Sequence, residues 1–210
     1  MEHPDLTFEK LLWEGGFHRV VGLDEAGRGA WAGPVCVAAV VLPPEETVAH
    51  DLSGVRDSKQ MSPAEREVWA PRIRAVALTW GLGFASAAEI DALGILPATK
   101  LAALRALEPL MVDYVLADAL LLPEIEWSQT ALIKGDQRSL SVAAASVLAK
   151  TSRDAHMLLL DRQYPKYGFA RHKGYGTPAH RAALERWGPC PEHRLSFAGI
   201  GLKQKVPKRE

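Results

Sequence analysis

The sequence has few cysteines and no long apolar segment, and both absences limit where the protein can work. No apolar run approaches the ~18 residues of a transmembrane helix, and the acidic residues 1–5 lack the apolar core of a signal peptide. Cys36 and Cys190 are the only cysteines, which fits a reduced cytosolic protein better than a disulfide scaffold. We therefore expect a cytoplasmic protein without a membrane partner, in which Cys36, inside an apolar run, is a buried small hydrophobic residue.

Several familiar site signatures are also missing. The chain has no Gly-x-x-x-x-Gly-Lys-Ser/Thr loop of a P-loop NTPase and no Gly-x-Ser-x-Gly elbow of a serine hydrolase. His172 with His180, or Cys190 with His193, would supply part of a zinc site, but neither set is complete at zinc spacing. Carboxylates are therefore the main candidates for a metal site.

What is present suffices for one domain with a full core, because the chain has 210 residues of which 48% are apolar. Apolar runs and alternation predict strands near residues 17–24, 35–42, 78–86, 112–117 and 130–134. Helical periodicity and capping signals predict helices near residues 6–14, 62–76, 86–94, 97–110, 139–163 and 177–188, with loops at 51–60 and 164–176. The first two strands are close enough to pair antiparallel, and the later ones follow helical crossovers. This order predicts an α/β fold with a mixed five-stranded sheet flanked by helices and a small C-terminal helical extension.

Charge is distributed unevenly although the net charge is zero. Residues 150–210 hold thirteen Lys and Arg against five Asp and Glu, whereas residues 84–136 hold three against eight. A basic C-terminal third and an acidic middle suit a protein that holds metal ions in one part and a polyanion with the other. An uneven but solvated surface is the alternative interpretation.

Carboxylates stand at the ends of three predicted strands. Asp24 and Glu25 end the first strand and precede a Gly27-Arg28-Gly29 turn, while Asp118 and Asp136 follow later strands. If these strands are neighbours, the acids meet at one end of the sheet, where open α/β sheets bind ligands. Clustered carboxylates repel one another, so divalent cations are expected there, and all-oxygen ligation favours two Mg²⁺ or Mn²⁺ ions. A polar turn after a strand is the alternative.

These acids also occur in a recognisable series of motifs, and the chain resembles the type 2 ribonuclease H family (ribonuclease HII) over about residues 18–197. In chain order the matching motifs are residues 24–29, Asp57-Ser58-Lys59, residues 115–119, Lys134-Gly135-Asp136 with residues 141–150 and Arg153-Asp154, residues 172–177, and residues 193–197. One departure is Arg56, where the family pattern has Asn. It puts in doubt a local contact near the substrate strand.

The resemblance implies a ribonuclease H-like core at residues 17–163, an N-terminal helical extension at 1–16, and a substrate-binding helical segment with a basic tail at 164–210. It implies a monomer that hydrolyses RNA in RNA/DNA hybrids and cuts on the 5′ side of a ribonucleotide in duplex DNA, leaving a 3′-hydroxyl and a 5′-phosphate. The implied metal ligands and catalytic residues are Asp24, Glu25, Asp118 and Asp136. The implied substrate-binding residues are Gly27, Arg28 and Gly29, which read the ribose 2′-hydroxyl, and Tyr175, which stacks on the adjoining sugar.

Further basic and hydroxyl side chains are candidates for phosphate contacts. They are Lys59, Ser146, Lys150, Arg171 and Lys173. For Lys150 and Arg153 the alternative is a pair of charges on a solvated helix face. Asp154, next to Arg153, is interpreted as structural.

Two other functions remain open at this point. A different phosphoryl-transfer nuclease could use the same acids, but the Gly-Arg-Gly turn and Tyr175 favour recognition of a 2′-hydroxyl. A non-catalytic hybrid-binding protein is the second alternative. It is disfavoured because binding alone does not require a costly cluster of negative charge.

Overall fold

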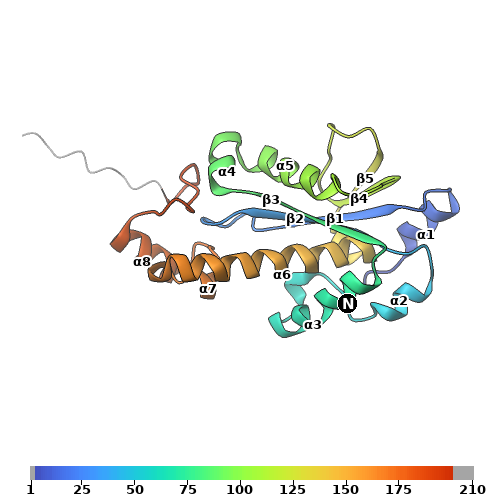
Figure 1. The fold of residues 1–210 in the computed structure, drawn as a ribbon, viewed down its shortest axis with the longest axis horizontal. Helices are drawn as coiled ribbons and strands as arrows, with labels where there is room; N and C mark the ends of the chain where they lie inside the picture. The colour runs from blue at the N-terminus through green and yellow to red at the C-terminus, as the bar shows by residue number, and fades with distance from the viewer. Residues whose placement is uncertain (1–2, 201–210) are drawn as a thin grey trace, which may run out of the picture.

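The computed structural model describes residues 3–200, whose centre is a mixed sheet of five strands in the order β3-β2-β1-β4-β5 (Figure 1). β1 (Val20–Ala26) runs antiparallel to β2 (Val35–Val41), which runs antiparallel to β3 (Thr79–Ala85). β4 (Tyr114–Asp118) lies parallel to β1, and β5 (Ser128–Leu132) lies parallel to β4. The predicted mixed five-stranded sheet is confirmed.

Helices cover both faces of this sheet, with α4 and α5 on one side and α3 and α6 on the other (Figure 1). α7 and α8 lie at the far end of α6, and form the C-terminal helical region (Figure 1). The helices are α1 (Thr7–Glu14), α2 (Thr47–Asp51), α3 (Pro63–Val76), α4 (Ala87–Leu93), α5 (Ile95–Leu107), α6 (Leu140–Gln163), α7 (Phe169–His172) and α8 (Pro178–Trp187). Short 3-10 turns are η1 (Ser58–Gln60), η2 (Gly135–Gln137) and η3 (Pro165–Tyr167). None of the helices in the described part of the chain is long and apolar enough to cross a membrane.

α6 is the long central helix, and small residues bring it close to the sheet. Ala143, Ala144 and Ala145 are all fully buried between α6 and the strands. A Cβ atom at Gly22 of β1 would lie 2.2 Å from the backbone carbon of Ser141, so no larger residue fits there. The Ala- and Ser-rich sequence of α6 thus sets the spacing of helix and sheet.

The local capping signals are confirmed. Ser62 and Glu65 form a reciprocal capping box at the start of α3, and Ser86 and Glu89 form another at α4. Thr177 caps α8 by accepting a hydrogen bond from the His180 N–H. These bonds satisfy N–H groups that a helix start leaves without partners.

Several predicted boundaries are wrong. Residues 51–60 contain the end of α2 and the η1 turn, and residues 164–176 contain η3 and α7 instead of a continuous loop. The last strand is Ser128–Leu132, displaced toward the N-terminus from the predicted 130–134. α7 is a single turn between two residues in the left-handed conformation, Gly168 and Lys173, and such a short element carries no periodic signal. Cys36 is fully buried as expected, and the predicted basic tail at 202–210 lies outside the described residues.

Candidate active site

The fold brings the predicted acids to one end of the sheet. Leu23 of β1 pairs in register with Ala117 of the parallel strand β4, so the next residues, Asp24 and Asp118, lie side by side. Asp136 follows in η2, where the Gly135 N–H donates to Asp118 Oδ1 at 2.8 Å. The parallel strand pair and the η2 turn that precedes α6 thus supply three of the four acids.

Glu25 follows Asp24 at the end of β1 and lies near enough that its charge helps to raise the pKa of Asp24. Its Oε1 accepts a hydrogen bond from Arg28 at 3.0 Å, so the turn after β1 neutralises part of its charge. Burial raises the pKa of Glu25, and Arg28 opposes that shift. Glu25 and Arg28 therefore link the acidic strand end to the Gly-Arg-Gly turn.

Burial and mutual repulsion dominate the electrostatics of the cluster. The side chain of Asp24 is nearly inaccessible, with the residue 4% exposed, and burial together with Glu25 and Asp118 raises its pKa well above the usual value. Its Oδ1 accepts from the Glu25 N–H at 2.7 Å, but its Oδ2 has no hydrogen-bond partner among residues 3–200. Burial, with Asp57 and Asp118 nearby, raises the pKa of Asp136 to about 6. The cluster therefore favours a bound cation or proton.

Lys59 supplies a positive charge at this place. Its Nζ lies 3.6 Å from Asp136 Oδ2. Burial alone would lower the pKa of Lys59, but Asp24 and Asp136 among the nearby acids raise it overall. Lys59 is thus an ammonium group that balances the carboxylates, in addition to being a candidate phosphate contact.

The donor set fits a hard cation. The candidate ligands are all carboxylate oxygens, which suit Mg²⁺ or Mn²⁺, and Asp24 Oδ2 is a buried oxygen whose lone pairs have no hydrogen-bond partner among residues 3–200. Within residues 3–200, however, no three His, Cys, Asp or Glu side chains are arranged closely enough to hold an ion as they stand. The four acids therefore share a location, but their side chains as they stand do not surround one ion.

Hydrogen bonds hold the Asp57-Ser58-Lys59 turn against α6 and η2. Asp57 accepts hydrogen bonds from the Lys59 N–H at 2.9 Å and from Gln137 Nε2 at 3.2 Å, beside Asp136. Ser146 is buried, and its hydroxyl donates to Ser58 Oγ at 2.8 Å. Ser146 therefore supports the turn in this structure and has no solvent-facing oxygen for a phosphate. Sequence reasoning gave Asp57 no role, although its place in the motif beside Lys59 was a signal.

Arg153 of α6 packs against Gly27, the first residue of the Gly-Arg-Gly turn. The residue is fully buried, so the alternative of a solvated helix charge is wrong. Its guanidinium donates to the carbonyls of Pro34 at 2.9 Å, Ala32 at 3.1 Å and Lys173 at 3.0 Å. Gly27 has φ +92°, and a Cβ atom there would lie 1.9 Å from Arg153 Nε. The first glycine of the turn is therefore required by the packing of Arg153.

Arg194 is a second buried arginine that sequence reasoning placed in a motif without a role. It donates to the carbonyls of Gly33 at 3.0 Å and Arg28 at 2.9 Å, so it holds the middle of the Gly-Arg-Gly turn. On the opposite side, the Trp31 N–H donates to the Gly174 carbonyl at 2.8 Å. These contacts bring the turn next to Tyr175, whose residue is 38% exposed and whose ring centre lies 5.5 Å from the Arg153 guanidinium.

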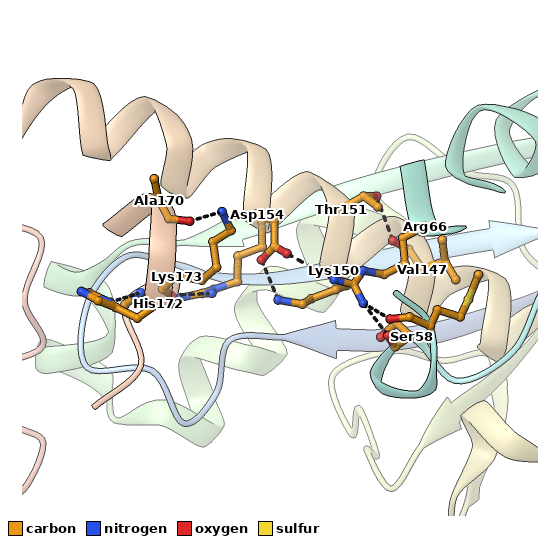
Figure 2. A network of polar contacts seen from close by, with 12 residues as sticks. Ser58, Arg66, Val147, Lys150, Thr151, Asp154, Ala170, His172 and Lys173 are labelled. Carbon is orange, nitrogen blue, oxygen red and sulfur yellow. Dashed lines mark hydrogen bonds and ion pairs between the residues drawn. The ribbon is translucent and has the colours of Figure 1, made fainter. Parts of the chain in front are cut away.

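A groove lies between α3, α6 and α7, and its mixed lining includes the basic residues Arg66, Arg171 and Lys173. Figure 2 shows Asp154 joined by dashed lines to Lys150 and to Arg66. Lys150 Nζ lies 2.6 Å from Asp154 Oδ1, and Arg66 lies 3.8 Å from Asp154 Oδ2. Lys173 donates to the Ala170 carbonyl at 2.6 Å. Lys150 is thus ion-paired and only partly exposed, Asp154 serves this pairing, and Arg171 and Lys173 line the groove.

Arg56, where the family pattern has Asn, forms an ion pair with Glu65 at 2.6 Å, which ties it to the start of α3.

Comparison with known proteins gives a consistent result. The family model for Ribonuclease HII matches residues 21–200. The Ribonuclease HII of Synechococcus sp. (strain JA-3-3Ab) is 55% identical over 198 residues, which cover 94% of this chain and 89% of that protein. That of Syntrophotalea carbinolica is 52% identical, with 93% and 92% covered.

Solved structures agree with the fold. The ribonuclease H2 from Pyrococcus horikoshii OT3 is similar with a TM-score of 0.73 and 25% identity, covering 87% of this chain and 95% of that one. The RNase HII in a PCNA:RNase HII complex from Archaeoglobus fulgidus also has a TM-score of 0.73, with 27% identity, 90% of this chain and 98% of that chain covered. The motif order, the acidic strand ends, the family match and the shared fold together show that the chain belongs to the ribonuclease HII family and is a ribonuclease H enzyme.

Proposed function

We propose that this enzyme hydrolyses the RNA strand of RNA/DNA hybrids and cuts on the 5′ side of ribonucleotides embedded in duplex DNA, so that it serves in the removal of ribonucleotides from DNA. The products carry a 3′-hydroxyl and a 5′-phosphate. The observation that carries this proposal is the contact between two features: a buried acidic cluster with the unpartnered Asp24 Oδ2, and the Gly-Arg-Gly turn directly after it.

Asp24, Glu25, Asp118 and Asp136 are the proposed metal ligands. Two Mg²⁺ or Mn²⁺ ions, when bound, supply the means to activate a water and to stabilise the leaving oxygen of a phosphodiester. Lys59 adds a positive charge beside Asp136, and Asp57 together with Gln137 keeps the turn that carries Lys59 in place. The hydrogen bond from the Gly135 N–H orients Asp118.

The turn at Gly27, Arg28 and Gly29 is the proposed reader of the 2′-hydroxyl, the group that distinguishes RNA from DNA at one sugar. Gly29 is exposed, and nothing lies within 4 Å of the position that its Cβ would occupy, so a substrate backbone can approach it closely. Tyr175 presents a half-exposed ring beside the turn, where it stacks on the adjoining sugar.

Phosphate contacts are assigned to the basic residues around this surface. Lys59, Lys150, Arg171 and Lys173 are the proposed members. We further propose the division into a catalytic core, residues 17–163, and a C-terminal substrate-binding segment from residue 164 onward. Two bonds join that segment to the core: Arg153 of the core donates to the Lys173 carbonyl, and Arg194 of the segment donates to the Arg28 carbonyl.

A single cleavage experiment tests the proposal. A DNA duplex with one ribonucleotide is incubated with the protein and Mg²⁺, Mn²⁺ or EDTA, and the cut is mapped against an all-DNA duplex. We expect one cut on the 5′ side of the ribonucleotide, dependent on the divalent ion. Cleavage of the all-DNA duplex, or a cut on the 3′ side, would contradict the proposed recognition.

The Asp118→Asn variant tests the ligand assignment. An asparagine oxygen can still accept from the Gly135 N–H, so the fold should persist while the ligand charge is lost. We expect cleavage to be abolished, Mn²⁺ binding by calorimetry to weaken, and duplex affinity to be largely kept. Full activity in this variant would remove Asp118 from the metal site.

A further inference from the structure

Three histidines gather directly behind Tyr175, and neither the acidic cluster nor the phosphate contacts involve them. This histidine cluster consists of His172, His180 and His193, all buried. The rings of His172 and His180 stack with centroids 4.4 Å apart and an interplanar angle of 14°. His180 Nε2 lies 3.0 Å from His193 Nε2. The histidines that the sequence offered as two partial zinc sets therefore form one group.

The hydrogen bonds of this cluster run in one direction. The Cys190 N–H can only donate, and it meets His193 Nδ1 at 2.9 Å, closer than the Cys190 carbonyl at 3.3 Å, so that nitrogen is an acceptor and the neutral ring carries its proton on Nε2. His193 Nε2–H then donates to His180 Nε2, which leaves the proton of His180 on Nδ1. His180 Nδ1–H donates to the Tyr175 carbonyl at 3.0 Å. A chain of neutral donors therefore ends on the backbone of Tyr175.

A metal role does not account for these residues. Both ring nitrogens of His180 and of His193 already have hydrogen-bond partners, and the described residues hold no group of three metal-ligating side chains arranged for an ion. Burial lowers the pKa of all three histidines, that of His180 to about 4, so the cluster is neutral near pH 7. Neutral rings suit a fixed chain of single donors and acceptors.

Tyr175 needs such an external anchor. It stands between Gly174, with φ +82°, and Gly176, and glycines on both sides leave the backbone little intrinsic preference. The Tyr175 N–H donates to the His172 carbonyl at 2.9 Å, and its own carbonyl accepts from the Thr177 N–H at 2.8 Å as well as from His180. The hydrogen bonds of the Tyr175 backbone therefore fix the position from which its exposed ring extends.

We propose that His180, oriented by His193, is a positioning residue that fixes the backbone of Tyr175 and so sets where its ring meets the substrate sugar beside the Gly-Arg-Gly turn. This inference rests on the proposed stacking role of Tyr175. It implies that the cluster affects selection of the junction between RNA and DNA more than hydrolysis itself, because none of its members reaches the acids.

The test compares His180→Phe with His180→Asn. Phenylalanine keeps the ring but removes both nitrogens, whereas the asparagine amide can place an N–H near the Nδ1 position and restore the bond to Tyr175. We expect His180→Phe to lower kcat/KM on a duplex with one embedded ribonucleotide by about 3- to 10-fold, the effect of losing one neutral hydrogen bond. On a continuous RNA/DNA hybrid it should stay within about 2-fold of the wild-type value. His180→Asn should recover most of the loss.

Tyr175→Ala separates the two levels of the proposal. If Tyr175→Ala cuts the embedded ribonucleotide as fast as the wild-type enzyme, the stacking role fails and this inference fails with it. If Tyr175→Ala is impaired but a folded His180→Phe keeps the wild-type preference between the two substrates, only the positioning role is refuted. The double variant should cut no more slowly than Tyr175→Ala, and multiplying losses would also refute it.

A measurement on the unmodified enzyme keeps the inference testable if His180→Phe does not fold. Nitrogen NMR of ¹⁵N-labelled histidines reports which ring nitrogen carries the proton. We expect the Nδ1–H tautomer for His180 and the Nε2–H tautomer for His193 at pH 7. The opposite tautomer at His180 would overturn the proposed chain.

Discussion

Alanine at Gly29 or at Gly27 separates what the Gly-Arg-Gly turn does for the fold from what it does for the substrate. A Cβ atom at Gly29 meets no atom within 4 Å, and the residue is exposed. Gly27 differs in both respects, because it has φ +92° and its Cβ would lie 1.9 Å from Arg153 Nε. The two substitutions add the same methyl group to one turn but meet opposite surroundings.

The magnitudes follow from those surroundings. Gly29→Ala should change the free energy of unfolding by no more than about 0.5 kcal/mol, as for most surface changes. Gly27→Ala costs about 1–2 kcal/mol for a left-handed alanine. It also displaces Arg153 from three backbone carbonyls, and each hydrogen bond of a charged donor is worth about 1.5–3 kcal/mol. With partial relaxation we expect a loss of about 3–6 kcal/mol, a large part of the 5–15 kcal/mol typical of a folded protein.

Thermal unfolding and single-turnover cleavage of a duplex with one ribonucleotide provide the two readouts. Gly29→Ala should unfold at the wild-type temperature but cleave more than about 10-fold more slowly, or about 1.4 kcal/mol of transition-state binding, because the methyl group keeps the sugar away from the turn. Wild-type cleavage by Gly29→Ala would refute the close approach of substrate to Gly29. Wild-type stability of Gly27→Ala would refute the packing role assigned to Arg153.

Three further outcomes are expected. The affinity of the Asp118→Asn variant for a duplex, measured by fluorescence anisotropy, should fall as the salt concentration rises. The logarithm of the binding constant should fall with the logarithm of the salt concentration by about 0.9 for each phosphate contact. An affinity that does not change with salt would refute phosphate binding by the basic residues. Arg194→Lys should lower the free energy of unfolding by about 1–3 kcal/mol, because one lysine ammonium cannot reach the Gly33 and Arg28 carbonyls at once. An unchanged chemical denaturation curve would show that those two bonds contribute little. The pKa of His180 is lowered to about 4 in the folded protein, against about 6.5 in the unfolded chain, so its contribution to stability is present above pH 6.5 and lost as pH falls toward 4. His180→Asn should therefore flatten the dependence of the free energy of unfolding on pH between these values. An unchanged dependence would show that another group titrates there. The titratable groups that act on His180 are His172 and His193, and the charged side chains that act on His172 are Asp161, Arg171 and Lys173.

Local signals explain what could be predicted from the sequence. The capping boxes at Ser62 and Ser86 depend on residues three positions apart, and both form as expected. The strand ends at Asp24 and Asp118 follow from apolar runs that stop at a carboxylate, and their convergence follows from the parallel crossover. The mixed five-stranded sheet and the location of the acids at one end of it were therefore within reach of pattern and topology.

Contacts between distant segments explain what could not. Arg194 binds the Arg28 carbonyl across 166 residues of sequence, and Arg153 binds Pro34 across 119. Arginine is rarely fully buried, so composition favours a solvated side chain in both places. The histidine cluster has the same origin, since His180 and His193 meet only because the segment after α8 returns to the first turn of that helix. No local periodicity encodes such contacts.

The glycines in the turn after β1 have different physical reasons, which the motif alone conceals. Gly27 and Gly33 both have positive φ, and side chains of α6, Arg153 and Met157, occupy the space where their Cβ atoms would lie. Their identity is therefore explained within the molecule. Gly29 has neither constraint, so an intramolecular cause for glycine is lacking there among the described residues. A glycine that the fold does not need, exposed beside a buried acidic cluster, is best explained by a partner that must come closer than a methyl group allows.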